Sequence, residues 1–135
     1  MVYNGINPSA KLGRFYKNMY LGGYEYMDYS IQTLFNAEKN CWEVAVSGEV
    51  DIFNSQEFKS NLVDLISEKK LNIIINCSEL NYMDSTALGA LVGVLKNAKS
   101  HGLEITLIHV KPNLLKLFKI TNLDKVFILE GDDNE

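Results

Sequence analysis

The sequence predicts an α/β fold in which a mixed β-sheet of four to five strands packs against helices. Three observations lead to this prediction. Polar and apolar residues alternate between positions 31 and 46, as in half-buried strands. Apolar residues then recur every three or four positions over 55–69 and again from 85 to 95, as in amphipathic helices. A short apolar run separates these helical patterns, so the order is β-β-α-β-α-β-α-β, a hairpin followed by strand–helix–strand crossovers.

The first two strands are predicted to form a hairpin that leads into a helix. The alternating positions of the two strands are Ile31, Thr33, Phe35, Trp42, Val44 and Val46. Residues 38–40 provide the turn, and the sequence Gly-Glu-Val-Asp at 48–51 ends the second strand. Asn54 with Glu57 three positions later has the spacing of a capping box, which predicts a helix over 55–69.

The next strand and helix surround the most informative segment of the chain, residues 81–89. The run 73–75 consists of three isoleucines, a composition typical of a central strand that is covered on both faces. The apolar period that follows places a helix start at or just after Ser85, where an oxygen of Asp84 or Ser85 can cap the first turn. Gly102 suits the left-handed position that ends such a helix.

The remaining predicted elements are a strand, a helix and a final strand. The strand covers 104–110, Pro112 fits the first turn of the helix, and Asn122 turns the chain into a strand over 126–128. Residues 30–129 therefore form the predicted domain.

The two ends of the chain differ in composition from this domain. Residues 1–29 contain six of the seven tyrosines and no sustained period, and we interpret them as an N-terminal extension that is poorly ordered or lies outside the domain. They are also compatible with translation from an upstream start, the true initiator being Met27, or with an aromatic arm that docks on a partner or on the domain. Residues 130–135 form an acidic tail that is expected to be disordered.

Charge and cysteine usage argue against several classes of function. The net charge of −4 arises in the acidic tail, and the remaining chain is balanced, which does not suit binding to nucleic acid phosphates. Cys41 and Cys77 lack the paired spacing of a zinc site or a disulfide framework, so we expect two buried reduced thiols. Because no apolar run approaches the ~20 residues of a membrane span and no signal core is found, we expect a cytoplasmic protein without membrane contact.

Motifs for catalysis and for nucleotide or metal binding are missing from the sequence. His101 ends a predicted helix and His109 lies in a predicted strand, neither beside an obvious nucleophile or ligand. No G-x-S-x-G elbow accompanies Ser85, and no glycine-rich phosphate loop is found. We therefore predict no catalytic residue, metal or cofactor, with a small hydrolase or nucleotide-binding enzyme kept as an alternative. Asp51 and Asp84 each follow a strand and are expected to converge at one end of the sheet.

Four segments of the chain resemble the STAS family, the domain shared by sulphate transporters and bacterial anti-sigma factor antagonists. They are Gly-Glu-Val-Asp at 48–51, the strand at 73–77, Met-Asp-Ser-Thr-Ala-Leu-Gly at 83–89 and Lys-Leu-Phe at 116–118. The resemblance runs from Tyr29 to Leu129 and implies a STAS-type fold. It departs from the family pattern at Ala87, where many relatives have glycine, and at Thr121-Asn122, which replace a glycine before the final strand.

The resemblance also implies a function. Antagonists of this family are free-standing, cytoplasmic and not enzymes, and they bind an anti-sigma factor so that its sigma factor is released for transcription. The anti-sigma factor is itself a serine kinase whose phosphorylation of the antagonist switches binding off, and a serine phosphatase reverses the modification. By matching position, the phosphorylated residue here is Ser85, in a protein expected to be a monomer. The implied partner-binding residues are Glu49, Asp51, Asn54, Met83, Asp84, Ser85, Thr86 and Leu88.

The same resemblance leaves a second function open. STAS proteins also serve as scaffolds or ligand-sensing modules of signalling complexes and lipid-transport systems. Such proteins need not be phosphorylated by a kinase that regulates a sigma factor. The identity of the partner separates the two functions.

Overall fold

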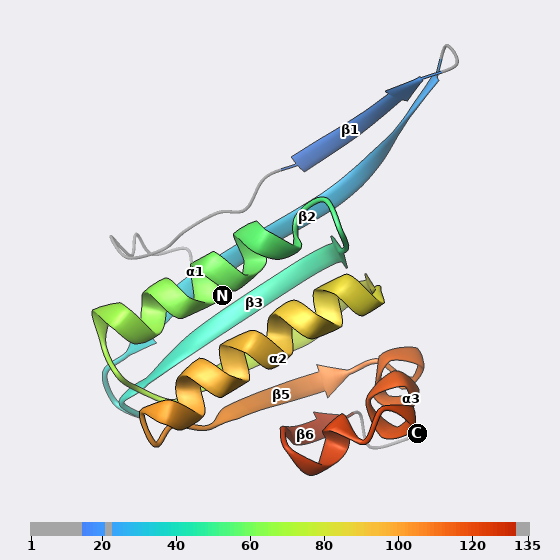
Figure 1. Ribbon diagram of the computed structural model, residues 1–135. Coiled ribbons are helices and arrows are strands. Elements are labelled where there is room, and N and C mark those ends of the chain that lie inside the picture. The colour runs from blue at the N-terminus through green and yellow to red at the C-terminus, as the bar shows by residue number, and fades with distance from the viewer. Residues whose placement is uncertain (1–14, 21–22, 132–135) are drawn as a thin grey trace.

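A computed structural model describes residues 15–20 and 23–131, with side chains from 29 to 130, and the described strands form one sheet in chain order (Figure 1). The strands are β1 (Phe15–Tyr20), β2 (Gly23–Asn36), β3 (Cys41–Val50), β4 (Ile73–Met83), β5 (Ile105–Val110) and β6 (Ile128–Gly131). The helices are α1 (Ser55–Glu68), α2 (Ser85–Ser100), α3 (Pro112–Ile120) and the short 3-10 helix η1 (Leu123–Lys125). Strands β1 to β3 pair antiparallel and β3 to β6 pair parallel, which confirms the predicted mixed sheet.

The described sheet has six strands, one more than the upper number predicted. The additional strand is β1, which pairs with the first part of β2 from Phe15 opposite Asp28 to Tyr20 opposite Gly23. Both segments belong to the predicted N-terminal extension, so its boundary at residue 29 falls within β2. The assignment of a separate extension stays a prediction, and its residues 1–14 and 21–22 lie outside the described part of the chain.

The three α-helices of the described residues pack on the same face of the sheet. Phe58 of α1, Leu91 of α2 and Leu114 of α3 meet the strand residues Val46 and Ile75 in one buried cluster. Figure 1 shows α1 and α2 side by side across the strands. Burial alternates accordingly over residues 29–33 of β2, 42–46 of β3, 73–77 of β4 and 105–108 of β5, because successive side chains of a strand point to opposite faces.

The expectation that residues 73–75 are covered on both faces is therefore wrong. They lie in the middle of the sheet, but Ile73 and Ile75 are buried whereas Ile74 is only partly buried. The opposite face carries a shallow hollow of about 410 Å³ that includes Ile74, Asn76 and Thr106. A run of β-branched residues fits a strand with either one or two covered faces, so composition does not distinguish them.

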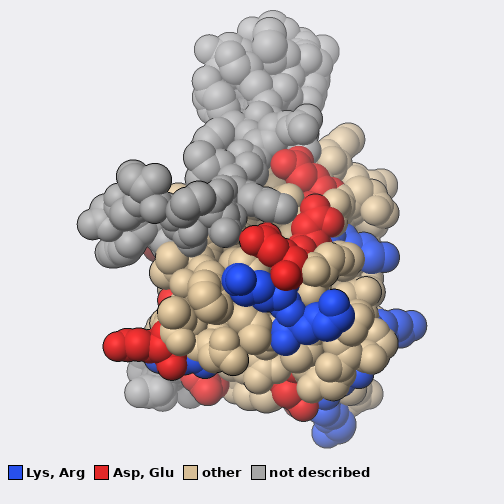
Figure 2. Space-filling model, turned by 90° about the vertical axis from the view of Figure 1, so that its left-hand side faces the viewer, with Lys and Arg blue, Asp and Glu red and all other residues tan. Residues whose placement is uncertain are grey.

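Acidic and basic side chains are mixed on the side of the molecule where α1 and α2 end. Figure 2 views this side, and on its described part positive and negative groups lie next to each other. One such pair joins Lys99 Nζ at the end of α2 to Glu104 Oε1 at 2.8 Å. Both side chains are about half exposed, so the pair contributes little to the free energy of unfolding.

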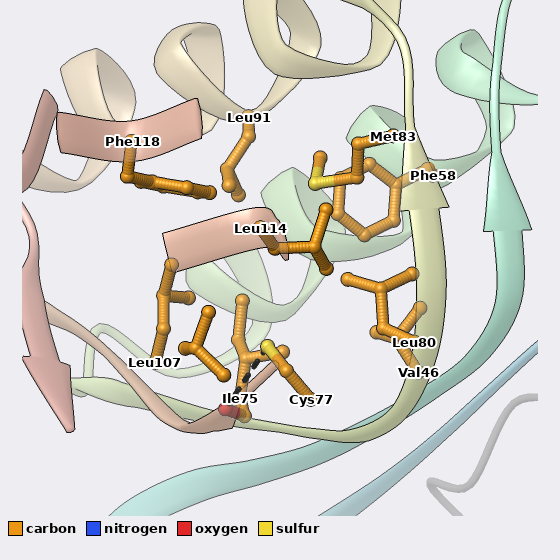
Figure 3. A pocket seen from close by; sticks show the side chains of 11 residues that line it. Val46, Phe58, Ile75, Cys77, Leu80, Met83, Leu91, Leu107, Leu114 and Phe118 are labelled. Carbon is orange, nitrogen blue, oxygen red and sulfur yellow. Dashed lines mark hydrogen bonds between the residues drawn. The ribbon is translucent and has the colours of Figure 1, made fainter. Parts of the chain in front are cut away.

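A small apolar cavity of about 10 Å³ lies in the core between the sheet and the helices (Figure 3). Phe58, Met83, Leu91 and Phe118 line it together with Cys77, whose Sγ donates a weak hydrogen bond to the carbonyl of Ile75 at 3.7 Å. Burial raises the pKa of the Cys77 thiol to about 12. A cavity of this size and chemistry has room for about one water but offers it no adequate set of polar partners, so we expect it to be dry.

The ends of the later helices follow the predicted chemistry, while the last strand is displaced. Gly102 has φ +73°, and the N–H of Leu103 bonds to the carbonyl of Ala98 at 2.9 Å, the closing bond of a Schellman motif. Asn122 adopts the left-handed conformation expected of it. The strand predicted over 126–128 lies instead at Ile128–Gly131, because η1 ends at Lys125 and Val126 and Phe127 form a turn after it. The expectation that the acidic tail is disordered from residue 130 is therefore wrong for residues 130 and 131, which belong to β6, and residues 132–135 lie outside the described part of the chain.

Candidate functional site

Asp84 joins two elements at the carboxyl end of the sheet. Its Oδ1 accepts a hydrogen bond from the backbone N–H of Ala87 at 2.8 Å and thereby caps α2. Its Oδ2 accepts a hydrogen bond from the backbone N–H of Ile52 at 3.0 Å, in the loop between β3 and α1. The helix cap is therefore Asp84, and the expectation that Ser85 itself can cap the helix is not met because Ser85 is already helical.

Ser85 occupies the first position of α2 and is exposed to solvent. Among the described residues its hydroxyl has no hydrogen-bond partner. The backbone N–H groups of the first turn and the helix dipole both favour negative charge at this position. The hydroxyl is therefore accessible to a modifying enzyme, and a phosphate there suits the helix end.

The loop between β3 and α1 is held by buried polar side chains. Asn54 Oδ1 accepts the N–H of Asp51 and its Nδ2 donates to the carbonyl of Glu49, both at 2.9 Å. Asp51 Oδ1 accepts the N–H of Phe53 at 2.9 Å. The predicted helix start is confirmed, but the capping box is wrong: Asn54 makes no side-chain cap bond because its amide is engaged with the loop.

The predicted convergence of Asp51 and Asp84 is confirmed. Strands β3 and β4 are parallel neighbours, and Val50 pairs with Met83 in their register, so the residues that follow them start from adjacent positions. The N–H of Asp84 also bonds to the carbonyl of Val50 at 3.3 Å. The carboxyl ends of parallel strands therefore bring the two loops into contact.

The other predicted partner-binding residues differ in exposure. Thr86 is exposed and Glu49 is partly buried, so both can take part in a surface contact. Met83 and Leu88 are 5% and 7% exposed and pack in the core, where they support the site from beneath. Asp51 and Asn54 are also buried and act here on the loop backbone. A direct contact of these residues with a partner stays a prediction.

Asp51 has one carboxylate oxygen without a partner. Its Oδ2 is buried, and no hydrogen-bond donor reaches it among the described residues. An unpaired buried acceptor costs about 1–3 kcal/mol, so this oxygen lowers the free energy of unfolding.

Within the described residues, no group of three or more His, Cys, Asp or Glu side chains is arranged to hold a metal ion.

Three exposed apolar side chains beside the site were missed from the sequence. Ile52 and Phe53 follow Asp51 in the loop, and Tyr82 is the second residue before Asp84. Their exposed fractions are 63%, 69% and 47%. The only sequence signal was that two large apolar residues lie in an otherwise polar loop. Periodicity predicts which residues of a helix or strand are buried, but it makes no such prediction for residues in a loop.

Together, these features define a small mixed α/β domain for surface recognition, with an exposed hydroxyl and apolar side chains at the carboxyl edge of its sheet. The STAS domain profile matches residues 32–134, and the chain belongs to this family. No helix of the described residues has the length and apolar composition needed to span a membrane.

Relatives and solved structures agree with this assignment. The chain is 32% identical over 110 residues to the anti-sigma-B factor antagonist of Staphylococcus aureus, an alignment covering 81% of this chain and 100% of that protein. The structure of the anti-sigma factor antagonist SpoIIAA in its unphosphorylated form matches with a TM-score of 0.60 at 17% identity, covering 76% of this chain and 89% of the other. The phosphorylated form of SpoIIAA from Bacillus matches with a TM-score of 0.58 at 18% identity, covering 76% and 92%. At these identities the two structures support the fold.

Proposed function

We propose that this chain is an anti-sigma factor antagonist whose binding is switched off by phosphorylation of Ser85. In this function the unphosphorylated protein binds an anti-sigma factor, which releases its sigma factor for transcription. The observation that carries the proposal is the exposed Ser85 hydroxyl at the start of α2, next to the residue that ties α2 to the β3–α1 loop. The full-length relatives named as antagonists support it.

The chemistry of the site suits a switch that leaves the fold intact. A phosphate adds about −1.5 to −2 charge beside the Asp84 carboxylate, so repulsion and desolvation oppose the docking of a complementary surface. The helix N-terminus favours the same charge by roughly 0.3–1 kcal/mol. The phosphate therefore leaves the fold of the free protein intact and raises the free energy of its complex with the partner.

The partners follow from this function. A serine kinase that is also the anti-sigma factor adds the phosphate, and a serine phosphatase removes it. The chain itself acts by association and has no catalytic activity of its own in this proposal, and it works in the cytoplasm, where sigma factors act.

Incubation with the purified anti-sigma factor kinase of the same genome and ATP tests the proposal. We expect one phosphate per chain, placed on Ser85 by mass spectrometry of its peptides. Ser85→Ala should remove the phosphate and keep binding, Ser85→Asp should weaken binding, and Thr86→Ala, which removes the neighbouring exposed hydroxyl, should still be phosphorylated. An unmodified Ser85 in the wild-type protein would exclude this function.

A further inference from the structure

Ile52 and Phe53 form an exposed apolar pair in the loop that is hydrogen-bonded to Asp84, the residue before Ser85. They are consecutive and are 63% and 69% exposed, in a loop whose other side chains, Asp51 and Asn54, are buried. Single exposed apolar residues are common on soluble proteins. Two adjoining large ones are less easily explained by chance, because contiguous exposed apolar surface marks interaction sites.

The backbone beneath this pair is fixed at both residues. The N–H of Ile52 bonds to Asp84 Oδ2 at 3.0 Å, and the N–H of Phe53 bonds to Asp51 Oδ1 at 2.9 Å. Hydrogen bonds to charged acceptors are roughly twice as strong as neutral ones. The two apolar side chains are therefore presented by an ordered loop, which reduces the entropy lost when a partner covers them.

We propose that Ile52 and Phe53 are the apolar anchor by which this chain enters a hydrophobic pocket of its anti-sigma factor. This inference rests on the function proposed above and adds the residues that supply its binding energy. A partner that phosphorylates Ser85 must place its active site over the start of α2. Because Asp84 connects that position directly to Ile52, the docked partner also lies over the anchor.

The same connection explains how one phosphate affects apolar binding. Ser85 is the residue after Asp84, and Asp84 accepts the hydrogen bond from the Ile52 N–H. A phosphate on Ser85 therefore adds negative charge close to the anchor. Burying the anchor would then require removal of water from the phosphate and from the Asp84 carboxylate. Phosphorylation of Ser85 thus weakens the contacts of Ile52 and Phe53 with the partner, although Ser85 takes no part in those contacts.

Affinity measurements with single variants test the anchor. The probe is the purified anti-sigma factor kinase of the same genome, titrated into each variant in a calorimeter. We expect Phe53→Ala to weaken binding about thirtyfold and Ile52→Ala about tenfold, as for central interface residues, while Phe53→Met retains most of the affinity. Ile120→Ala is the matched control, since Ile120 is also 69% exposed but lies at the end of α3, and its affinity should stay within about twofold.

The outcomes separate this inference from the function on which it rests. If the wild-type protein does not bind the kinase, the proposed function fails and the anchor with it. If the wild type binds and Phe53→Ala binds equally well, only the anchor is wrong. The remaining alternative is that the anchor binds a second copy of this chain, and analytical sedimentation of the free proteins tests it. A wild-type dimer that Phe53→Ala dissociates would assign the anchor to that contact and overturn the inference.

Discussion

At the scale of single residues, Asp84 connects the start of α2, where we propose that Ser85 is phosphorylated, to the loop that carries the exposed apolar pair. One carboxylate oxygen caps α2 and the other binds the Ile52 N–H. The first bond was accessible from sequence, because an aspartate before an apolar helical period is a common cap. The second depends on the parallel pairing of β3 and β4, which places two loops together that lie some thirty positions apart in the chain.

Replacing Asp84 should reduce the free energy of unfolding. Asp84→Ala removes the cap and the loop bond together, and we expect a loss of about 2 kcal/mol. Chemical denaturation followed by circular dichroism measures it. Glu79→Ala, which removes an exposed acid of β4, is the control and should change the value by less than about 0.5 kcal/mol. Equal effects of the two substitutions would mean that the Asp84 bonds contribute nothing.

Cys77 predicts how stability depends on pH. Its folded pKa of about 12 lies above the ordinary value of 9.0, so the folded protein holds this proton more tightly than the unfolded chain does. The contribution is constant below pH 9 and is lost as the pH rises from 9 toward 12, with a slope of at most about 1.4 kcal/mol per pH unit. Comparing the slopes for wild type and Cys77→Ala isolates this thiol, and identical slopes would contradict its burial.

At the scale of elements, the helix ends were the most predictable features and the loops the least. Pro112 and Gly102 act through their own backbone chemistry, so their positions at the start of α3 and the end of α2 follow from residue type. The Asn54 amide was assigned to a cap and instead holds the β3–α1 loop, since several backbone partners compete for it. The exposure of Ile52 and Phe53 could not be predicted from the sequence, because it depends on which side chains the surrounding elements cover.

Two glycines of the α2 region should respond in opposite ways to the same substitution. Gly102 has φ +73°, a conformation in which Gly102→Ala costs about 1 kcal/mol. Gly89 lies inside α2, and an added methyl group there would meet no atom within 4 Å beyond the adjoining backbone of its own helix, so Gly89→Ala should stabilise the protein by about 0.5–1 kcal/mol. Thermal or chemical unfolding of both variants checks the signs. A stabilising Gly102→Ala would contradict the Schellman ending of α2.

At the scale of the whole molecule, the sheet separates packing from recognition. The three helices cover one face and bury the core there, while the candidate site lies at the carboxyl ends of β3 and β4. The α/β class, the element order and the family were all predictable, because they depend on periodicities and motifs that extend over the chain. The additional strand β1 was not, since its segment shows no clear alternation.

The most direct test of the account is the affinity of the anti-sigma factor kinase for the unphosphorylated chain and for the chain phosphorylated on Ser85. Isothermal titration of the two forms, with circular dichroism to verify that both are folded, supplies this comparison. We predict that the phosphate weakens binding about a thousandfold, equivalent to about 4 kcal/mol, without loss of helix or strand signal. Equal affinities of the two folded forms would contradict the role of Ser85 as a switch.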